Sequence, residues 1–167
     1  MSAEAYIKLY QTMGINTTIF RLFNVYGPGQ NLDNKIQGMA SIYLSYMLEG
    51  TPIIVRGSKD RFRDFIYIDD VVDVWLKSFD NPVTYGKLYN LASGEKTRVE
   101  DLIVILKSSF GNNGYPVEYR NGTPGDQFGI AADISRIMKE LKWRPKTNLH
   151  SGLNKMVDFE KKRLGIR

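Results

Sequence analysis

Apolar residues recur at three- and four-residue spacing in several stretches of this sequence, and each stretch predicts an amphipathic helix. Residues 2–13 form the first, which Gly14 ends, while Gly50 ends the second and Pro145 forbids continuation of the fifth. The expected inward-facing positions are Ala3, Tyr6, Tyr10 and Met13; Ile36, Met39, Ala40, Tyr43 and Met47; Val71, Val72, Trp75, Leu76 and Phe79; Leu102, Ile103, Leu106 and Phe110; Ile134, Ile137, Met138 and Leu141; and Leu153, Met156, Val157 and Leu164.

Short runs of β-branched and aromatic residues lie between these stretches and predict strands. Thr17–Val25 is the longest run and reads as a buried strand, which Gly27-Pro28-Gly29 terminates. Shorter strands are expected at Ile53–Val55, Asp64–Ile68 and Leu88–Ala92, with an edge strand at Val117–Tyr119. Because strands alternate with helices, the pattern favours an α/β fold.

Three of the predicted helices follow residues that can cap them. Asp69 or Asp70 can cap the third helix, and Asp133 can cap the fifth. Thr97-Arg98-Val99-Glu100 has the capping-box pattern ahead of the fourth, in which a threonine and a glutamate satisfy each other's backbone amides.

The composition is that of an ordinary soluble globular protein, with 167 residues, 43% apolar and 25% charged. No apolar run approaches the roughly 20 residues of a membrane span, and no signal peptide is visible. The chain has no cysteine, and His150 is its one histidine, so we expect no disulfide and no metal site. A reducing, cytoplasmic setting fits this composition.

The net charge of +5 raises the question of a polyanionic partner. The charges are scattered, however, and Lys161-Lys162-Arg163 is the one basic run, which reads as a solvated helix face. We therefore expect no nucleic-acid partner, whereas a sugar nucleotide is also anionic and needs only a few well-placed arginines.

Two motifs carry a family resemblance. Arg21–Gly29 reads Arg-Leu-Phe-Asn-Val-Tyr-Gly-Pro-Gly, and Arg63–Val71 reads Arg-Asp-Phe-Ile-Tyr-Ile-Asp-Asp-Val. With Pro124-Gly125-Asp126, Tyr89–Gly94 and Leu141–Pro145, they resemble the C-terminal half of the extended short-chain dehydrogenases/reductases, the NAD-dependent sugar-nucleotide epimerases and dehydratases of the UDP-glucose 4-epimerase type. The resemblance implies the C-terminal part of a Rossmann-type fold: a remnant of the parallel sheet and a small mixed α/β substrate-binding domain.

The same resemblance divides the chain. It implies that residues 1–30 are a remnant of the dinucleotide-binding domain and that residues 31–167 form the sugar-nucleotide-binding domain. In the family the glycine-rich turn and a Tyr-x-x-x-Lys pair come earlier in the chain, and this sequence contains neither, since Gly27-Pro28-Gly29 lacks an amide donor at its proline. Ser2-Ala3-Glu4 resembles the residues that follow the catalytic lysine, so we expect that lysine directly before Met1.

Asn24 is the first candidate site residue. It ends an apolar strand, where ligands usually meet the sheet of an α/β protein, and its amide both donates and accepts hydrogen bonds. The residues alone favour a turn asparagine satisfied by nearby backbone. The resemblance favours a contact to the diphosphate or sugar of the substrate.

Arg63 is the second candidate, because a guanidinium has forked donors that suit phosphate oxygens. The alternative is a surface ion pair with Asp64, which would contribute little. The resemblance implies that Arg63 contacts the nucleotide diphosphate. Residues 59–61, just before it, look like an exposed turn.

Asp126 is the third candidate and can accept hydrogen bonds from the hydroxyl pair of a nucleotide ribose; an Asx turn is an equal alternative. The family often has an arginine before its Pro-Gly-Asp core, but Thr123 stands at that position. This departure puts one substrate contact in doubt, and Arg120 is the residue that could replace it.

The remaining candidates rest on the resemblance. It implies that Leu22, Phe23 and Val25 lie near the nicotinamide of NAD. It also implies that the backbone of Gly38 and Met39 touches the uracil or thymine, although Met39 fits a core helix face equally well.

We expect, then, the substrate-binding portion of an NAD-dependent nucleotide-sugar epimerase or dehydratase, with no catalytic residue of its own and no tight NAD binding. Its partner would be a UDP- or dTDP-sugar. An uncovered apolar surface around residues 3–25 would favour a homo-oligomer or association with a missing N-terminal half. The alternative is a non-catalytic sugar-nucleotide-binding or interaction module that another chain completes.

Overall fold

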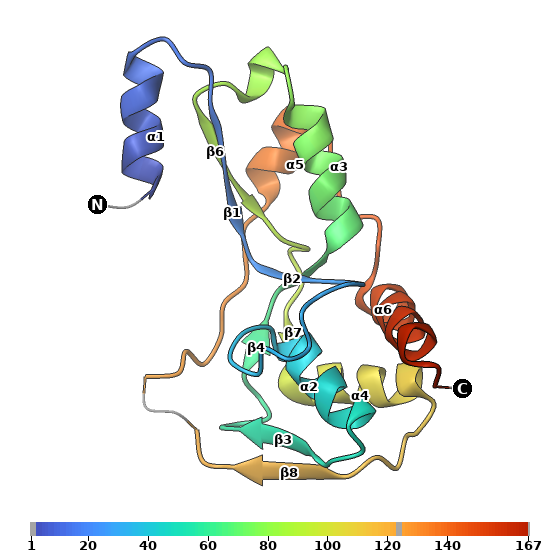
Figure 1. Cartoon of the computed structure of the whole chain (residues 1–167). Helices are drawn as coiled ribbons and strands as arrows, with labels where there is room; N and C mark the ends of the chain where they lie inside the picture. The colour runs from blue at the N-terminus through green and yellow to red at the C-terminus, as the bar shows by residue number, and fades with distance from the viewer. Residues whose placement is uncertain (1–2, 123–124, 167) are drawn as a thin grey trace.

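The computed structural model describes residues 3–122 and 125–166 and shows an α/β protein (Figure 1). The helices are α1 (Ala3–Thr12), α2 (Met39–Leu48), α3 (Ile68–Ser78), the 3-10 turn η1 (Pro82–Thr84), α4 (Val99–Phe110), α5 (Ser135–Leu141) and α6 (Leu149–Leu164). The strands are β1 (Thr18–Leu22), β2 (Asn24–Tyr26), β3 (Ile53–Arg56), β4 (Phe62–Arg63), β5 (Phe65–Tyr67), β6 (Lys87–Leu91), β7 (Thr97–Arg98) and β8 (Val117–Arg120).

The strands pair two by two, and most pairs are parallel. β1 pairs with β6, β2 with β5 and β3 with β8 in parallel, whereas β4 and β7 are antiparallel. Each parallel pair joins segments far apart in the sequence, as α/β connections require. The predicted fold class, a parallel sheet beside a small mixed α/β part, is confirmed.

The long strand predicted at Thr17–Val25 is interrupted, because the chain changes its pairing partner at Phe23. The Phe23 amide donates to the Leu91 carbonyl at 3.1 Å, and the next amide, that of Asn24, donates to the Asp64 carbonyl at 3.1 Å. The prediction that this strand is buried was wrong for its second half, since Arg21 and Leu22 are exposed.

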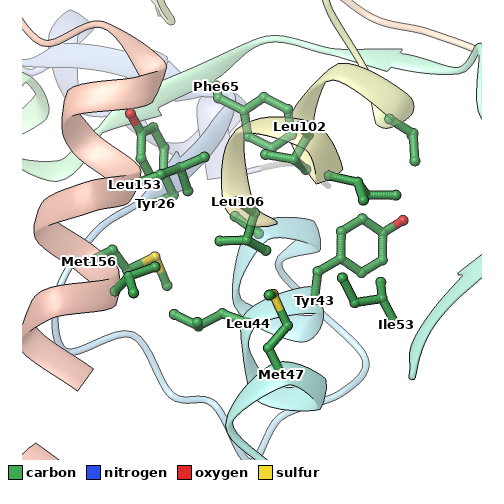
Figure 2. Close-up of a cluster of buried hydrophobic side chains, with 14 of the residues drawn as sticks. Tyr26, Tyr43, Leu44, Met47, Ile53, Phe65, Leu102, Leu106, Leu153 and Met156 are labelled. Atoms are coloured by element: carbon green, nitrogen blue, oxygen red, sulfur yellow. The ribbon is translucent and has the colours of Figure 1, made fainter. Parts of the chain in front are cut away.

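A closed core lies between α2, α4 and α6 (Figure 1). Figure 2 shows the side chains of Leu44, Leu102, Leu153 and Met156 pointing toward one another from these helices. β3 lies against α2 and contributes Ile53, so helices and a strand surround this cluster. We call this cluster, with its other buried members, the closed core: Tyr26, Leu32, Ala40, Tyr43, Met47, Val55, Phe65, Tyr67, Val99, Ile103, Leu106, Tyr115 and Val157.

A second, smaller cluster lies where β1 and β6 meet α3 and α5; we call these elements, with α1, the open region. Its buried members are Ile66, Val71, Val74, Tyr89, Leu91, Ala92, Ile134, Ile137 and Trp143. In Figure 1, α1 stands apart beside β1, and none of the residues Ala3–Thr12 is buried. A two-pronged ion pair between Arg21 and Glu4, with a shortest distance of 2.7 Å, joins α1 to β1.

Of the inward positions predicted for α3, Val71 is buried as expected and the other four are not. The buried side chains are Val71 and Val74, together with the polar Asp70 and Ser78. Val72, Trp75, Leu76 and Phe79 are exposed, and Phe79 is 85% exposed. The helix carries two apolar stripes, and the buried one, with Val71 and Val74, is the narrower.

Ile36 was also misplaced, because α2 begins at Met39 and Ile36 lies before it, 95% exposed. The other apolar positions predicted for α2 are buried or partly buried. Leu164, at the end of α6, is 48% exposed.

None of the three capping predictions places the N-cap residue correctly. α3 starts at Ile68, so Asp69 and Asp70 lie within its first turn, and Asp70 instead accepts the amides of Lys146 and Thr147 at 3.0 Å each. Arg98 precedes α4 without a capping bond from its side chain. The N-cap of α5 is Ile134, so Asp133 lies one residue before it, although its side chain accepts the Ser135 amide at 2.8 Å.

Within the part of the chain that the structure describes, no helix is both long enough and apolar enough to cross a bilayer.

Candidate functional site

A pocket of about 730 Å³ lies where β1 and β2 end and α2 begins. Carboxyl ends of parallel strands are the usual ligand-binding edge of an α/β sheet. Its lining includes the predicted residues Leu22, Phe23, Asn24, Val25, Gly38 and Met39. The structure therefore brings six of the eight candidate residues to one pocket.

The side chain of Asn24, which lines this pocket, is held by one hydrogen bond. Its Nδ2 donates to the Asp64 carbonyl at 2.9 Å. The partner is the neighbouring chain segment and not the turn at Gly27-Pro28, so the bond orients the side chain across two strands. The Oδ1 of Asn24 is then the acceptor available for a ligand.

Gly38 presents bare backbone to the pocket. Its φ of 94° lies in the region that favours glycine, and a Cβ there would collide with the Ser41 hydroxyl and the Gln30 side-chain amide. Met39 follows as the first residue of α2 and is partly buried.

Gln30 is a pocket residue that sequence reasoning missed. Its Oε1 is buried and has no hydrogen bond to any residue that the structure describes, although buried acceptors are normally satisfied. The signal available in the sequence was its position directly after Gly29, at the end of the first motif.

Arg63 and Asp126 form an ion pair away from the lining of the pocket. Arg63 Nη2 lies 3.2 Å from Asp126 Oδ1, and Nη1 donates to the Phe62 carbonyl at 2.8 Å. The sequence separates these two candidates by 63 positions, and the structure brings them together. The alternative partner considered for Arg63, Asp64, makes other contacts.

The prediction of an exposed turn at residues 59–61 holds for Lys59 and Asp60 and is wrong for Arg61. It is 7% exposed and pairs with Asp126, so Asp126 lies between two guanidinium groups. Its Nε donates to the Ser58 carbonyl at 3.1 Å, and its Nη2 donates to the Arg56 carbonyl. The turn buries an arginine because these carbonyls and one carboxylate satisfy its donors.

The electrostatics of this cluster follow from burial and from like charge. Burial lowers the pKa of Arg63, and the positive charge of Arg61 lowers it further. Burial raises the pKa of Tyr43, on α2, to about 12, while both arginines oppose that rise.

Asp64 is a second residue that sequence reasoning missed. It is 0% exposed and accepts hydrogen bonds from the amides of Ser93, Gly94 and Ala132 and from the Ser93 hydroxyl, at 2.6–3.1 Å. These bonds join the end of β6 and the approach to α5 to the start of β5. The side chain of Asp64 thereby fixes the backbone of its own residue, which follows Arg63 and whose carbonyl Asn24 contacts.

Other predicted residues have different outcomes. Arg120 lies on β8, exposed and paired with Glu118 at 2.7 Å, with its backbone aligned beside Arg56. Thr123 and Pro124 lie outside the described residues, as do Met1 and Ser2. Among the described residues no group of three or more histidine, cysteine, aspartate or glutamate side chains is placed to hold a metal ion.

Comparisons with known proteins agree on the family. Residues 1–92, more than half of the chain, match the NAD dependent epimerase/dehydratase family. The dTDP-4-dehydro-6-deoxyglucose reductase of Escherichia coli is 33% identical to this chain over 137 residues, which are 82% of this chain and 42% of that protein. The chain spans about half the length of the curated relatives it matches.

Two solved structures are similar over nearly the whole chain. UDP-glucose 4-epimerase of Thermotoga maritima, with UDP-glucose, has a TM-score of 0.85 at 29% identity and covers 97% of this chain and 53% of its own. UDP-glucuronic acid 4-epimerase of Bacillus cereus, with UDP-glucuronic acid and NAD, has a TM-score of 0.84 at 26% identity and covers 96% and 50%. With the strand-end pocket and the matching motifs, these comparisons show that the chain belongs to the NAD-dependent epimerase/dehydratase family.

Proposed function

We propose that this chain is the substrate-binding portion of an NAD-dependent nucleotide-sugar epimerase or dehydratase, and that it does not turn over substrate alone. The proposal rests on one observation, the hydrogen bond that joins the pocket to the chain segment of Arg63. Asn24, in the pocket, donates to the carbonyl of Asp64, the residue that follows Arg63. A ligand with a sugar and a diphosphate could thus meet both groups at once.

The roles follow from chemistry. Arg63 would take the diphosphate, Asn24 the sugar, and Asp126 the hydroxyls of the ribose. The bare backbone at Gly38 and the side chain of Met39 would lie against the uracil or thymine. The similar structures that hold UDP-glucose and UDP-glucuronic acid support a UDP- or dTDP-sugar as the ligand class.

NAD fits the edge of the pocket formed by Leu22, Phe23 and Val25, whose apolar side chains suit the face of a nicotinamide ring. When bound, NAD accepts and returns a hydride. These three residues would exclude water from the ring. They offer no donor for a pyrophosphate beyond their backbone, so tight binding of NAD to this chain alone is not expected.

The open region supports a partner for this chain. β6 is the one strand that pairs with β1 among residues 3–122 and 125–166, and parallel sheets normally have more strands and covered faces. The exposed stripe of α3, with Trp75 and Phe79, lies beside this sheet, and Trp75 stacks on Phe20 of β1 with 6.4 Å between ring centroids. We propose that an N-terminal half, or a second copy, covers this surface.

The division into residues 1–30 and 31–167 stays a prediction. β1, from the first part, pairs along its whole length with β6, from the second, so the two parts share a sheet.

A second candidate function, a non-catalytic sugar-nucleotide-binding or interaction module, is favoured by the same exposed stripe. Titration calorimetry with UDP-, dTDP- and GDP-sugars separates a chain that binds sugar nucleotides from a module that only interacts with another protein. We expect heat with a UDP- or dTDP-sugar, and a loss of affinity of at least about tenfold in Arg63→Ala, because a charge-assisted bond to phosphate is removed. Arg120→Ala is the matched control, since Arg120 is exposed and paired with Glu118.

Turnover is tested separately by mixing the purified chain with NAD and UDP- or dTDP-sugars. We expect no epimerised or dehydrated sugar. Product formed by the chain alone would refute the proposal, and an absence of heat with every nucleotide sugar would leave the interaction module as the better reading.

A further inference from the structure

Two arginines share one carboxylate beside the proposed diphosphate site. Arg61 and Arg63 both pair with Asp126, and the side chains of the two arginines are 9% and 13% exposed. One carboxylate cannot neutralise two guanidinium groups, so this cluster keeps a net positive charge in a partly buried place. Such a cluster is suited to a further anion.

The two arginines hold Asp126 unequally. Arg61 has further bonds from Nε and Nη2 to the carbonyls of Ser58 and Arg56, so its guanidinium is fixed. The backbone of the same turn packs on it, because a Cβ at Gly57 would lie 3.1 Å from its Cζ. Arg63 donates from Nη1 to the Phe62 carbonyl at 2.8 Å, but its contact with Asp126 is longer, 3.2 Å, and its contact with the Phe128 carbonyl is marginal at 3.4 Å.

We infer that Arg61 is a positioning residue for the diphosphate site. Its fixed guanidinium neutralises Asp126, so that Arg63 can exchange its long contact with that carboxylate for bonds to a diphosphate. Arg61 does not touch the anion in this arrangement and acts through Asp126. The inference rests on the proposed function, because it takes a diphosphate as the ligand of Arg63.

The inference predicts what happens when Arg61 loses its charge. In Arg61→Gln, Asp126 has Arg63 as its remaining cation, so their ion pair tightens and competes with the ligand. Replacing that carboxylate as well, in Arg61→Gln with Asp126→Asn, removes the competitor and frees Arg63 again. The effect of losing a residue that merely shapes the turn at 56–61 would persist after a change at Asp126.

Calorimetry with UDP on the full chain tests this. We expect Arg61→Gln to weaken UDP binding about threefold to tenfold in the parent chain. In the Asp126→Asn background, where the ribose contact is already lost, Arg61→Gln should weaken UDP binding no further, because the competing carboxylate is absent. Arg61→Lys should stay close to the parent because it keeps the charge. Arg56→Gln is the control. Arg56 is exposed at the end of β3, next to the same turn, and the substitution removes one positive charge without changing a partner of Asp126.

The ligand-free chain provides a second measurement. Nuclear magnetic resonance of the arginine side chains should show slower exchange of the Arg63 Nη protons with water in Arg61→Gln than in the parent, and faster exchange in the double variant. Thermal unfolding of each variant confirms that it is folded.

The outcomes separate this inference from the proposed function. Absence of UDP binding by the parent chain, with unchanged Arg63 exchange in Arg61→Gln, would overturn both. UDP binding by the parent that Arg61→Gln leaves unchanged, or a double variant that binds UDP more weakly than Asp126→Asn alone, would overturn the positioning role and leave the proposed function standing.

Discussion

The closed core and the open region use the same kinds of side chain to different ends. In the closed core, helices α2, α4 and α6 and strand β3 face inward from several sides, and Leu102, Leu106 and Leu153 are each fully buried. In the open region, α1 buries none of its residues and α3 leaves its broader apolar stripe exposed. The closed core has enough elements to enclose its apolar surface. In the open region, among the described residues, β1 is paired along one edge only, with β6.

The difference teaches where this chain is self-sufficient. Apolar burial is the dominant favourable contribution to folding, and it is most extensive in the region that also positions Gly38 and Met39. The region that would meet NAD, near Leu22 and Phe23, is the incomplete one. The substrate side of the proposed site is thus on the firmer part of the molecule.

The largest effect should come from breaking the closed core. Leu102→Ala should lower the free energy of unfolding by about 2–5 kcal/mol, because it removes a fully buried side chain and leaves a cavity. Val104→Ala is the control, since Val104 is 60% exposed on the same helix and should cost about 0.5 kcal/mol or less. Urea unfolding followed by circular dichroism measures both, and equal losses would contradict the description of the core.

A second effect should come from the junction between the regions. Asp64→Ala removes the acceptor of three backbone amides and should cost about 1–3 kcal/mol. In Asp64→Ala we also expect the two regions to unfold at different urea concentrations, so that the near-ultraviolet and far-ultraviolet signals change at separate transitions. Asp60→Ala, which removes an exposed carboxylate on the preceding turn, should leave a single transition; two coincident transitions in Asp64→Ala would count against the junction.

The exposed stripe of α3 should affect assembly more than stability. We expect the chain to self-associate at micromolar concentration, and Trp75→Lys with Phe79→Lys to shift it toward monomer, because charges replace an apolar contact surface. Sedimentation velocity measures the shift. Val104→Lys adds one charge to the exposed side of α4 and should leave the distribution unchanged; a double variant that sediments like the parent would show that the open region is not a contact surface.

The smallest effect should be a pH dependence confined to the open region. Glu140 of α5 accepts hydrogen bonds from Tyr89 and Lys87 of β6, which lower the pKa of its carboxyl from 4.5 to about 2. A lowered folded pKa stabilises the protein above pH 4.5 and loses that contribution as the pH falls from 4.5 toward 2. Glu140→Gln should therefore flatten the fall of the melting temperature in that window, and Glu118→Gln should not.

What the sequence could predict depended on how local the cause was. The helix with Leu102 and Leu106 was predictable because its apolar positions form one face. The face of α3 was not, because Val71 and Val74 alternate with Val72 and Trp75 and nothing local says which stripe meets the sheet.

The candidate site shows the same limit. Asn24, Gly38 and Met39 lie on segments close in sequence, and the structure brings them to one pocket. The burial of Arg61 could not be predicted, because its partner Asp126 is 65 positions away and the residues around Arg61 have the composition of an exposed turn. The acceptor role of Asp64 likewise depends on Ser93 and Ala132, which only the folded chain brings near.

The register of β1 and β6 has a consequence for synthesis on the ribosome. Thr18 aligns with Lys87, so the first strand is made 69 positions before its partner. At ordinary translation rates that interval is about 3–14 s, during which β1 lacks its partner β6. A nascent chain of this design gives chaperones a defined period in which to bind Ile19 and Phe20, and slowing translation between the two strands would lengthen it.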